Sequence, residues 1–466
     1  MSRTDVVQLL YIVAFALFIY GLMGLTGPRT AVRGNRIAAV GMAIAVIATL
    51  LIPGMGNWGL IILGAAIGTA VGIPAARQVK MTAMPQMVAL FNGVGGGAVA
   101  LIAWVEFRHT GGYANEPTYV AIFSLFAAIV GSVSFWGSNI AFGKLQELLP
   151  GRPITVGPGR TQQVLNLALL LVAVACAVAI VGGSDAELLM IVLLLASAVL
   201  GNFVVLPIGG ADMPVVISLL NAFTGLSAAA TGVALNNTAL IVAGMIVGAS
   251  GSILTNLMAQ AMNRSIPSIV AGGFGGVITT GGTTEDGVER VVRSTSASDA
   301  AVQMAYANRV VIVPGYGMAV AQAQHAVREL TKMLESKGIE VSFAIHPVAG
   351  RMPGHMNVLL AEADVPYDQL KEMDDANGEF ARTDVSLVIG ANDVTNPDAR
   401  NKADSPIYGM PILNVDESAS VIVLKRSMNS GFAGIDNPLF YNDKTAMLFG
   451  DAKASVGEIT EELKAL

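Results

Sequence analysis

Nine apolar segments, each close to membrane-spanning length, occupy most of the first 265 residues of this chain. A helix needs about 20 mostly apolar residues to cross a bilayer. The first segment has no small-residue cleavage site, so it is predicted to be a membrane helix and not a removable signal peptide. The sequence therefore predicts a helical domain embedded in the lipid bilayer over residues 1–265. The segments lie at roughly 6–25, 37–52, 58–76, 86–106, 118–142, 163–182, 187–206, 213–234 and 238–261.

Composition separates this half of the chain from the rest. The 466 residues are 53% apolar and only 13% charged, whereas charged residues make up about 25% of an ordinary soluble protein. Residues 1–265 carry 11 Lys/Arg and 7 Asp/Glu, and residues 266–466 carry 16 and 26. The second half is thus predicted to be an acidic soluble domain, which argues against nucleic acid as a partner. The single cysteine, Cys176, lies in an apolar run and excludes an intrachain disulfide.

Basic residues predict the orientation in the membrane. With nine spans, the connecting loops fall into two sets on opposite sides, and cytoplasmic loops carry the excess of Lys and Arg. One set holds nine basic residues and the other holds two. We therefore expect an inner (plasma) membrane protein whose N-terminus is outside and whose C-terminal domain is cytoplasmic. The nine are Arg29, Arg33, Arg36, Arg77, Lys80, Lys144, Arg152, Arg160 and Arg264, and the two are Arg3 and Arg108.

Polar side chains inside the spans are candidates for a proton path. Ionisable groups at membrane depth are functional candidates, whereas Asn or Ser can also simply hydrogen-bond two helices. For Asn92 and Asn221 both interpretations stay open. No histidine is expected inside a span, so a proton relay through histidine would need a residue of another chain. The polar candidates are Asn92, Ser138, Asn139, Asn221 and Thr224, with Asp212 at the mouth of the eighth span; the histidines are His109, His325, His346 and His355.

A glycine-rich stretch follows the last span. Residues 272–287 read GGFGGVITTGGTTEDG, a composition typical of a flexible tether. The sequence thus predicts a linker over residues 266–290 and a second domain over residues 291–466. A short helix is expected at about 297–307.

The run RVVIVPGYG at 309–317 predicts the first unit of a dinucleotide-binding fold. Its β-branched start is typical of a buried strand, and Gly315 with Gly317 and Val320 fits the glycine fingerprint of a nucleotide-binding turn. A helix is expected to follow as far as about Lys337, with an anion at its N-terminus. The alternative is a strand, turn and helix with no ligand.

Later strands predict the rest of a Rossmann-like α/β domain. The second, Glu340–Ile345, ends at His346 without the acidic residue that holds the ribose of NAD, which favours NADP. Val385–Ile389 runs into a polar loop at 390–393. Val421–Leu424 runs into Lys425, Arg426 and Ser427, which could clamp a phosphate or form a solvated basic edge. A last strand at 446–449 leads through residues 450–452 into the closing helix.

Long motifs in this order resemble the β subunit of the proton-translocating NAD(P) transhydrogenases, over essentially the whole chain. The motifs are PGYGMAVAQAQ at 314–324, HPVAGRMPGHMNVLLAEA at 346–363, IGANDVTNP at 389–397 and KRSMNSGFAG at 425–434. The resemblance implies a Re/Si-specific enzyme that transfers hydride from NADH on a partner α subunit to NADP⁺, with inward proton translocation. It also implies NADP(H) bound in reversed orientation and a dimer of the complex.

The resemblance also implies roles for individual residues. Lys425 and Arg426 would hold the 2′-phosphate, and Asp393, near the nicotinamide, would sense protonation. Asn221, Asp212, Ser138 and Arg264 match positions of the proton path or of its link to the soluble domain. With the glycine turn, the predicted cofactor-binding residues are Gly315, Tyr316, Gly317, Val320, Val348, Ala349, Gly350, Arg351, Met352, Pro353, Gly390, Ala391, Asn392, Asp393, Val394, Gly409, Met410, Lys425, Arg426, Ser427, Met428, Asn429, Ser430, Gly431, Phe432, Asp451 and Ala452.

Two residues depart from the family pattern. Asn92 stands where many relatives carry a histidine, and Phe432 where some carry a tyrosine. In such variants the proton-carrying histidine is expected on a helix of the partner subunit. Because hydride transfer needs donor and acceptor about 3–3.5 Å apart, and one nucleotide site is predicted here, NAD(H) must come from that partner. The alternative function is an ion channel or transporter gated by an NADP-sensing domain, without redox chemistry.

Overall fold

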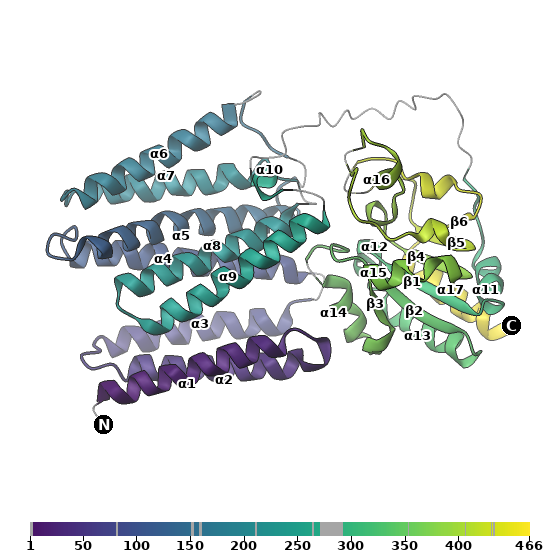
Figure 1. Cartoon of the computed structure of the whole chain (residues 1–466), viewed down its shortest axis with the longest axis horizontal. Helices are drawn as coiled ribbons and strands as arrows, with labels where there is room; N and C mark the ends of the chain where they lie inside the picture. The colour runs from purple at the N-terminus through teal and green to yellow at the C-terminus, as the bar shows by residue number, and fades with distance from the viewer. Residues whose placement is uncertain are drawn as a thin grey trace. The chain divides into compact units, whose positions relative to one another are not determined.

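The computed structural model (Figure 1) describes residues 3–80, 83–150, 153–157, 161–209, 212–262, 265–270, 292–352, 354–405, 407–429, 431 and 434–466. The chain divides into two compact units. One contains α1–α7 with most of α8 and α9, and the other contains a parallel sheet. The predicted glycine-rich tether lies mostly outside the described residues, although its start forms a short helix, α10 (Ile266–Val270).

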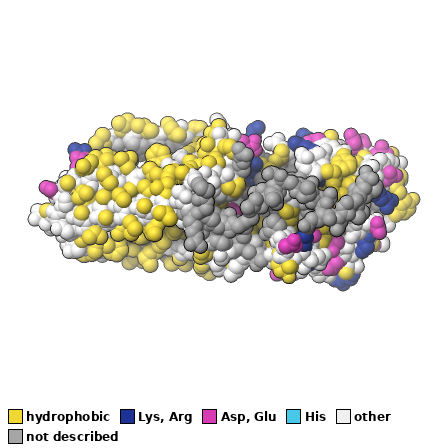
Figure 2. Space-filling view, turned by 90° about the horizontal axis from the view of Figure 1, so that it is seen from above, with side chains coloured by type: hydrophobic (Ala, Val, Ile, Leu, Met, Phe, Trp, Pro, Cys, Tyr) yellow, Lys and Arg dark blue, Asp and Glu magenta, His cyan; other side chains and the backbone are white. Residues whose placement is uncertain are grey.

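Nine helices of the described residues are long and apolar enough to cross a membrane. This confirms the predicted multi-span helical domain. Figure 2 shows apolar side chains spread over the surface that the helical unit presents in that view, as expected of side chains in contact with lipid. The helices are α1 (Arg3–Gly24), α2 (Pro28–Leu50), α3 (Trp58–Gln78), α4 (Met84–His109), α5 (Thr118–Leu145), α6 (Thr161–Val181), α7 (Glu187–Val205), α8 (Met213–Ala234) and α9 (Thr238–Ala261).

Two details of the membrane prediction were wrong. Helix α2 begins at Pro28 and not near residue 37, so Arg29, Arg33 and Arg36 lie in its first turns. Proline is favoured at the first helical position, and a helix end can carry basic residues outside the apolar stretch. His109 is the last residue of α4, so one histidine does stand at the end of a span.

Small residues allow close contact between α4 and α5. A Cβ placed on Gly96 of α4 would lie 2.8 Å from the carbonyl oxygen of Gly131 on α5. Helices in lipid associate through this kind of close backbone packing. The glycines of the fourth span are therefore explained by packing.

In the part of the second unit that the structure describes, six parallel strands form a sheet in the order β3-β2-β1-β4-β5-β6. This is the order of the doubly wound dinucleotide-binding fold, and the winding reverses between β1 and β4. It confirms the predicted Rossmann-like fold class. The strands are β1 (Arg309–Pro314), β2 (Glu340–Ile345), β3 (Leu370–Glu372), β4 (Val385–Ile389), β5 (Ser420–Lys425) and β6 (Thr445–Phe449).

The core lies on the central strands, whose apolar runs are buried. Phe380 and Phe440 pack with strand valines such as Val388 and Val423 on one side of the sheet. Helices α11 (Ala297–Ala305) and α13 (Gln324–Ser336) each pack against α17 (Ala452–Ala465) (Figure 1).

The helix after β1 differs from the prediction. Instead of one helix to Lys337, the chain forms α12 (Tyr316–Val320) and then α13. Between them Gln322 has a φ of +50°, which no residue of a right-handed helix adopts. Strand β3 was not predicted, because three residues, Leu-Lys-Glu, give no apolar run.

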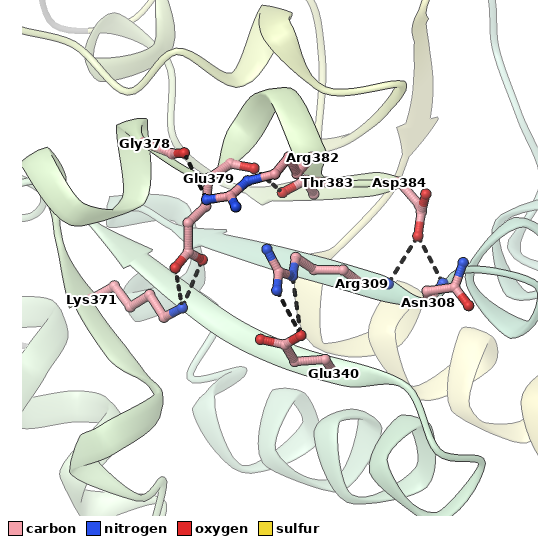
Figure 3. Close-up of polar contacts among 9 residues, drawn as sticks. All are labelled: Asn308, Arg309, Glu340, Lys371, Gly378, Glu379, Arg382, Thr383 and Asp384. Atoms are coloured by element: carbon pink, nitrogen blue, oxygen red, sulfur yellow. Dashed lines mark hydrogen bonds and ion pairs between the residues drawn. The ribbon is translucent and has the colours of Figure 1, made fainter.

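Ionic contacts fix the sheet at its amino edge (Figure 3). Arg309 donates two hydrogen bonds to Glu340 Oε2, at 2.8 and 3.2 Å, across the starts of β1 and β2. The hydrogen bond that Arg309 donates to Glu340 raises the pKa of the Arg309 guanidinium. Just before β4, Asp384 Oδ2 accepts the backbone N–H groups of Asn308 and Arg309 at 2.8 and 2.9 Å. The amino ends of three strands are thus tied together, and the loops at the carboxyl ends are left to form a site.

Candidate functional site

The turn after β1 packs directly on the loop after β4. The N–H of Gly315 donates to Ile389 O at 2.9 Å, and the N–H of Gly317 donates to Gly390 O at 3.0 Å. A Cβ on Gly315 would lie 2.4 Å from the backbone of Ala391. The glycines are therefore required for loop packing. The predicted anion at this helix start stays a prediction; α12 has only five residues, and the N–H of Gly317 is already bonded to Gly390 O.

Two buried histidines hold the loop after β2 through hydrogen bonds. The His346 ring lies 2.8 Å through Nε2 from Pro411 O, and its Nδ1 accepts the N–H of Val348 at 3.3 Å. His355, the first residue of α14 (His355–Glu362), accepts the N–H of Arg351 through Nδ1 at 3.1 Å. Burial lowers the pKa of each ring to about 4. Both rings are therefore neutral at physiological pH.

The loop after β2 also meets the turn after β1. The guanidinium carbon of Arg351 lies 4.4 Å from the centroid of the Tyr316 ring. A cation at this distance over an aromatic face is attracted to it. Two segments that are distant in the sequence thus come together. Both were predicted to line the cofactor.

The loop after β4 contacts two other predicted segments, at Gly431 and Met410, and also Asn437, which was not a predicted site residue. Asn437 Nδ2 donates to Asn392 O at 3.1 Å. A Cβ on Gly431 would lie 2.6 Å from Asp393 Oδ1, so Gly431 lies close to that carboxylate. Met410, next to the exposed Gly409, is buried in a small apolar cluster against which Val394 packs.

The two cations at the end of β5, Lys425 as its last residue and Arg426 directly after it, have different neighbours. Lys425 Nζ donates to Asn429 O and lies 5.1 Å from the Phe440 ring centroid. Burial lowers the pKa of the Lys425 ammonium, opposed by Asp393 and Asp436. The more exposed Arg426 pairs with Asp451 Oδ2 at 3.3 Å.

Asp451 also forms the N-cap of α17, because its Oδ1 accepts the N–H groups of Lys453 and Ala454. Ala452 is the first residue of that helix. Ser427 and Asn429 are exposed, and Met428 packs against the core. Val348, Gly350 and Met352 are half-buried, Ala349 is buried and Val320 is exposed. Pro353, Ser430, Phe432 and Arg264 lie outside the described residues.

The arrangement fits a dinucleotide. The loops after β1, β2, β4, β5 and β6 meet at the carboxyl edge of the sheet, where doubly wound folds bind ligands. Three cations, Arg351, Lys425 and Arg426, lie on these loops and suit a ligand with several phosphates. The backbone of Gly350, at a φ of +107°, and that of Gly390, at +66°, adopt conformations that favour glycine.

A second polar group lies inside the helical unit and joins α4, α5 and α8. Asn92 Nδ2 donates to Ser138 Oγ at 2.9 Å and to Ser134 Oγ at 3.3 Å. Ser134 Oγ lies 2.5 Å from Thr224 Oγ1. Asn92 Oδ1 is buried and accepts no hydrogen bond within the described part of the chain. We call Asn92, Ser134, Ser138 and Thr224 the membrane polar cluster.

The structure groups some of the predicted membrane residues and not others. Asn221 lies three residues before Thr224, on the same side of α8, but no hydrogen bond of the described residues ties it to the cluster. Asn139 donates to Phe135 O of its own helix. Asp212 immediately precedes α8. Ser134 was missed, although its position four residues before Ser138 places it on the same face of α5.

Comparison with known proteins identifies the family. A sequence profile described as NAD(P) transhydrogenase beta subunit matches residues 7–462. Two relatives from Rhodospirillum rubrum, each called NAD(P) transhydrogenase subunit beta, are 48% identical over 468 aligned positions, covering 97% of this chain and 98% of theirs. The chain belongs to the NAD(P) transhydrogenase beta subunit family. It is thus a multi-pass membrane subunit of a transhydrogenase, as its motifs predicted.

Family membership does not assign the residues of the site. The transhydrogenase motifs at 314–324, 346–363, 389–397 and 425–434 follow β1, β2, β4 and β5, and each supplies a loop at the carboxyl edge of the sheet. Their grouping in space is consistent with one shared ligand. The role of each residue is therefore part of the proposal below.

Proposed function

We propose that this chain binds NADP(H) at the carboxyl edge of its sheet and conducts protons through its helical unit. The observation that carries the proposal is the presence, in one chain, of two features. One is a parallel sheet with basic loops at its ligand-binding edge, and the other is an apolar helix bundle with a buried polar cluster.

The residues of the sheet edge suit NADP(H) better than NAD(H). Lys425 and Arg426 would hold the 2′-phosphate, and Arg351 over Tyr316 would lie beside the rest of the nucleotide. The end of β2 carries His346, a buried neutral ring, where NAD-binding folds place a carboxylate. When bound, NADP⁺ supplies the hydride acceptor, and the protein binds, orients and excludes water. Asp393 would hold or release the proton that couples the two units.

The second nucleotide is assigned to another subunit. Hydride donor and acceptor must approach to about 3–3.5 Å, and this chain offers one dinucleotide-type sheet among its described residues. An α subunit carrying NAD(H) would dock on the exposed cofactor face, and the whole complex would be a dimer. In this arrangement the enzyme is Re/Si-specific and belongs to the translocases.

Proton passage would drive the reaction towards NADPH. One proton crossing 100 mV releases about 2.3 kcal/mol, which shifts an equilibrium roughly fifty-fold. In this proposal protons move into the cytoplasm, and the sheet unit lies on that same side. Most of the basic residues that flank the spans are assigned to the cytoplasmic side as well. The membrane polar cluster, with Asn221 and Asp212, would form the proton path in this chain. Arg264 and the glycine-rich segment would transmit the effect of proton passage to the cofactor loops.

The test is reconstitution of the chain with its α subunit in liposomes, following NADPH absorbance with NADH and NADP⁺ supplied. We expect an inward proton gradient to raise the rate and extent of NADPH formation, and a protonophore to abolish the gain. Replacing Asp393 with Asn is expected to remove most of this activity. Ion flux that responds to NADP⁺ without NADH or an α subunit would instead support a gated channel.

A further inference from the structure

The ring of His355 fills the space beneath the loop that follows β2. Its side chain is fully buried, with 0% exposure. A Cβ on Gly350 would lie 2.4 Å from His355 Nδ1, so the loop wraps closely around this ring. The next residue along the loop, Arg351, donates its N–H to the same Nδ1 at 3.1 Å. One ring atom therefore sets the path of the loop at two successive residues.

The hydrogen bond determines the tautomer of the ring. Because Nδ1 accepts, the single proton of the neutral ring is on Nε2. His355 Nε2 is buried and has no hydrogen-bond partner among the described residues, so Nδ1 makes the polar contact that can hold the loop. Burial and the charge of Arg351 lower the pKa of His355 to about 4, which keeps the acceptor available at neutral pH.

Arg351, whose backbone N–H donates to His355, also contacts the turn after β1 through its side chain. Arg351 lies over Tyr316, 4.4 Å from the ring centroid. We propose that His355 is a positioning residue that, through its Nδ1 contact with the Arg351 backbone, orients Arg351 for the phosphates of NADP(H). The inference rests on the proposed function, because it requires that Arg351 contacts the cofactor. His355 itself is buried behind the loop.

Three substitutions separate this role from simple packing. His355→Asn places an amide oxygen two bonds from Cβ, at the position of Nδ1, and so keeps the acceptor. His355→Gln moves the acceptor one bond further out, and His355→Leu removes it. His325→Asn, at an exposed position of α13, is the control for loss of a histidine.

Two measurements on the full chain in detergent report on the proposal. Without cofactor, hydrogen exchange at the Arg351 amide is expected to be faster in the Gln and Leu variants than in the Asn variant or the parent. By fluorescence titration, the Gln and Leu variants are expected to bind NADPH about tenfold more weakly, the fold-change of one lost buried hydrogen bond. The Asn variant is expected to stay within about threefold of the parent. With the α subunit present, the KM for NADP⁺ should rise while kcat is retained.

The outcomes separate this inference from the proposed function. If the parent chain does not bind NADPH, the proposed function fails. If the parent binds it and the Asn and Gln variants bind it equally well, or equally poorly, only the role of His355 is overturned. Should the Leu variant not fold, the comparison of Asn with Gln still decides.

Discussion

Gly317 and Gly390 pack backbone against backbone. A Cβ on Gly317 would lie 2.7 Å from Gly390 Cα, and a Cβ on Gly390 would lie 2.3 Å from Gly317 Cα. The contact joins the turn after β1 to the loop after β4, where the strand order reverses. The glycine fingerprint of this chain therefore serves contact between two loops.

Replacing Gly390 with Ala should damage the sheet unit severely. The new methyl group would meet Gly317, and the alanine backbone would have to adopt a φ of +66°. We therefore expect a loss of about 3 kcal/mol or more in unfolding free energy. Gly338→Ala is the matched control, because its φ is +84° but nothing lies within 4 Å of the added Cβ. That variant should lose only about 1 kcal/mol. Equal shifts of the two thermal unfolding midpoints would contradict the backbone contact.

Removing a cation at the end of β5 should weaken NADPH binding selectively. Lys425→Gln and Arg426→Gln each delete a charge-assisted contact to the 2′-phosphate, which is expected to weaken binding roughly tenfold to a hundredfold. Binding of NADH, which lacks that phosphate, should change little. Lys332→Gln removes an exposed cation from α13 and is the control. Titrations with both nucleotides give the comparison, and a parallel loss for NADH would argue against a phosphate clamp.

Long periodic or apolar runs made the large features predictable. The nine spans and five of the six strands follow directly from such runs, because an uninterrupted apolar stretch has few alternatives. Start points were harder to predict. Helix α2 extends back to Pro28 over three arginines, which hydropathy alone assigns to a loop.

Contacts between segments were not predictable from local pattern. The break at Gln322, where φ is +50°, interrupts a helical pattern, and nothing in the local sequence signals it. His355 was noted only as a histidine outside the membrane, because its role depends on a loop folded over it. The motif resemblance named four segments that the structure brings to one edge of the sheet, since each motif directly follows a strand, and their contact with a cofactor stays a prediction.

Ser138 should matter for proton coupling more than another buried serine of the same helix. Ser138 accepts from Asn92, whereas Ser132 donates to Leu194 O of α7 at 3.1 Å, outside the membrane polar cluster. We expect Ser138→Ala to remove most of the gradient-driven NADPH formation and to leave NADPH affinity unchanged. Ser132→Ala should retain the coupled rate. Equal rates in the two variants, measured in liposomes, would show that the cluster only packs helices.

Acid should destabilise the sheet unit through its buried histidines. The pKa values of His346 and His355 are lowered from 6.5 to about 4, so the unfolded chain binds protons that the folded chain does not. The contribution of the two neutral rings to the unfolding free energy is complete above about pH 6.5. It falls as the pH drops towards 4, by at most about 3 kcal/mol for each ring. Thermal unfolding of the parent should therefore shift downwards between about pH 7 and pH 5.

The matched comparison for this effect is between two Asn variants. His355→Asn removes one titrating group and should flatten the pH dependence, and His325→Asn, at an exposed position of α13, is the control for loss of a histidine. Identical slopes in all three proteins would contradict a neutral buried His355.

The central claim is that proton movement through the helical unit changes NADP(H) chemistry on the sheet unit of the same chain. The most direct measurement imposes an inward proton gradient on liposomes containing the chain and its α subunit, with NADH and NADP⁺ present, while the NADPH/NADP⁺ ratio is followed to its plateau. We predict a plateau that rises with the gradient and returns to the uncoupled value when a protonophore is added. A plateau independent of the gradient, in a preparation that still transfers hydride, would contradict the account.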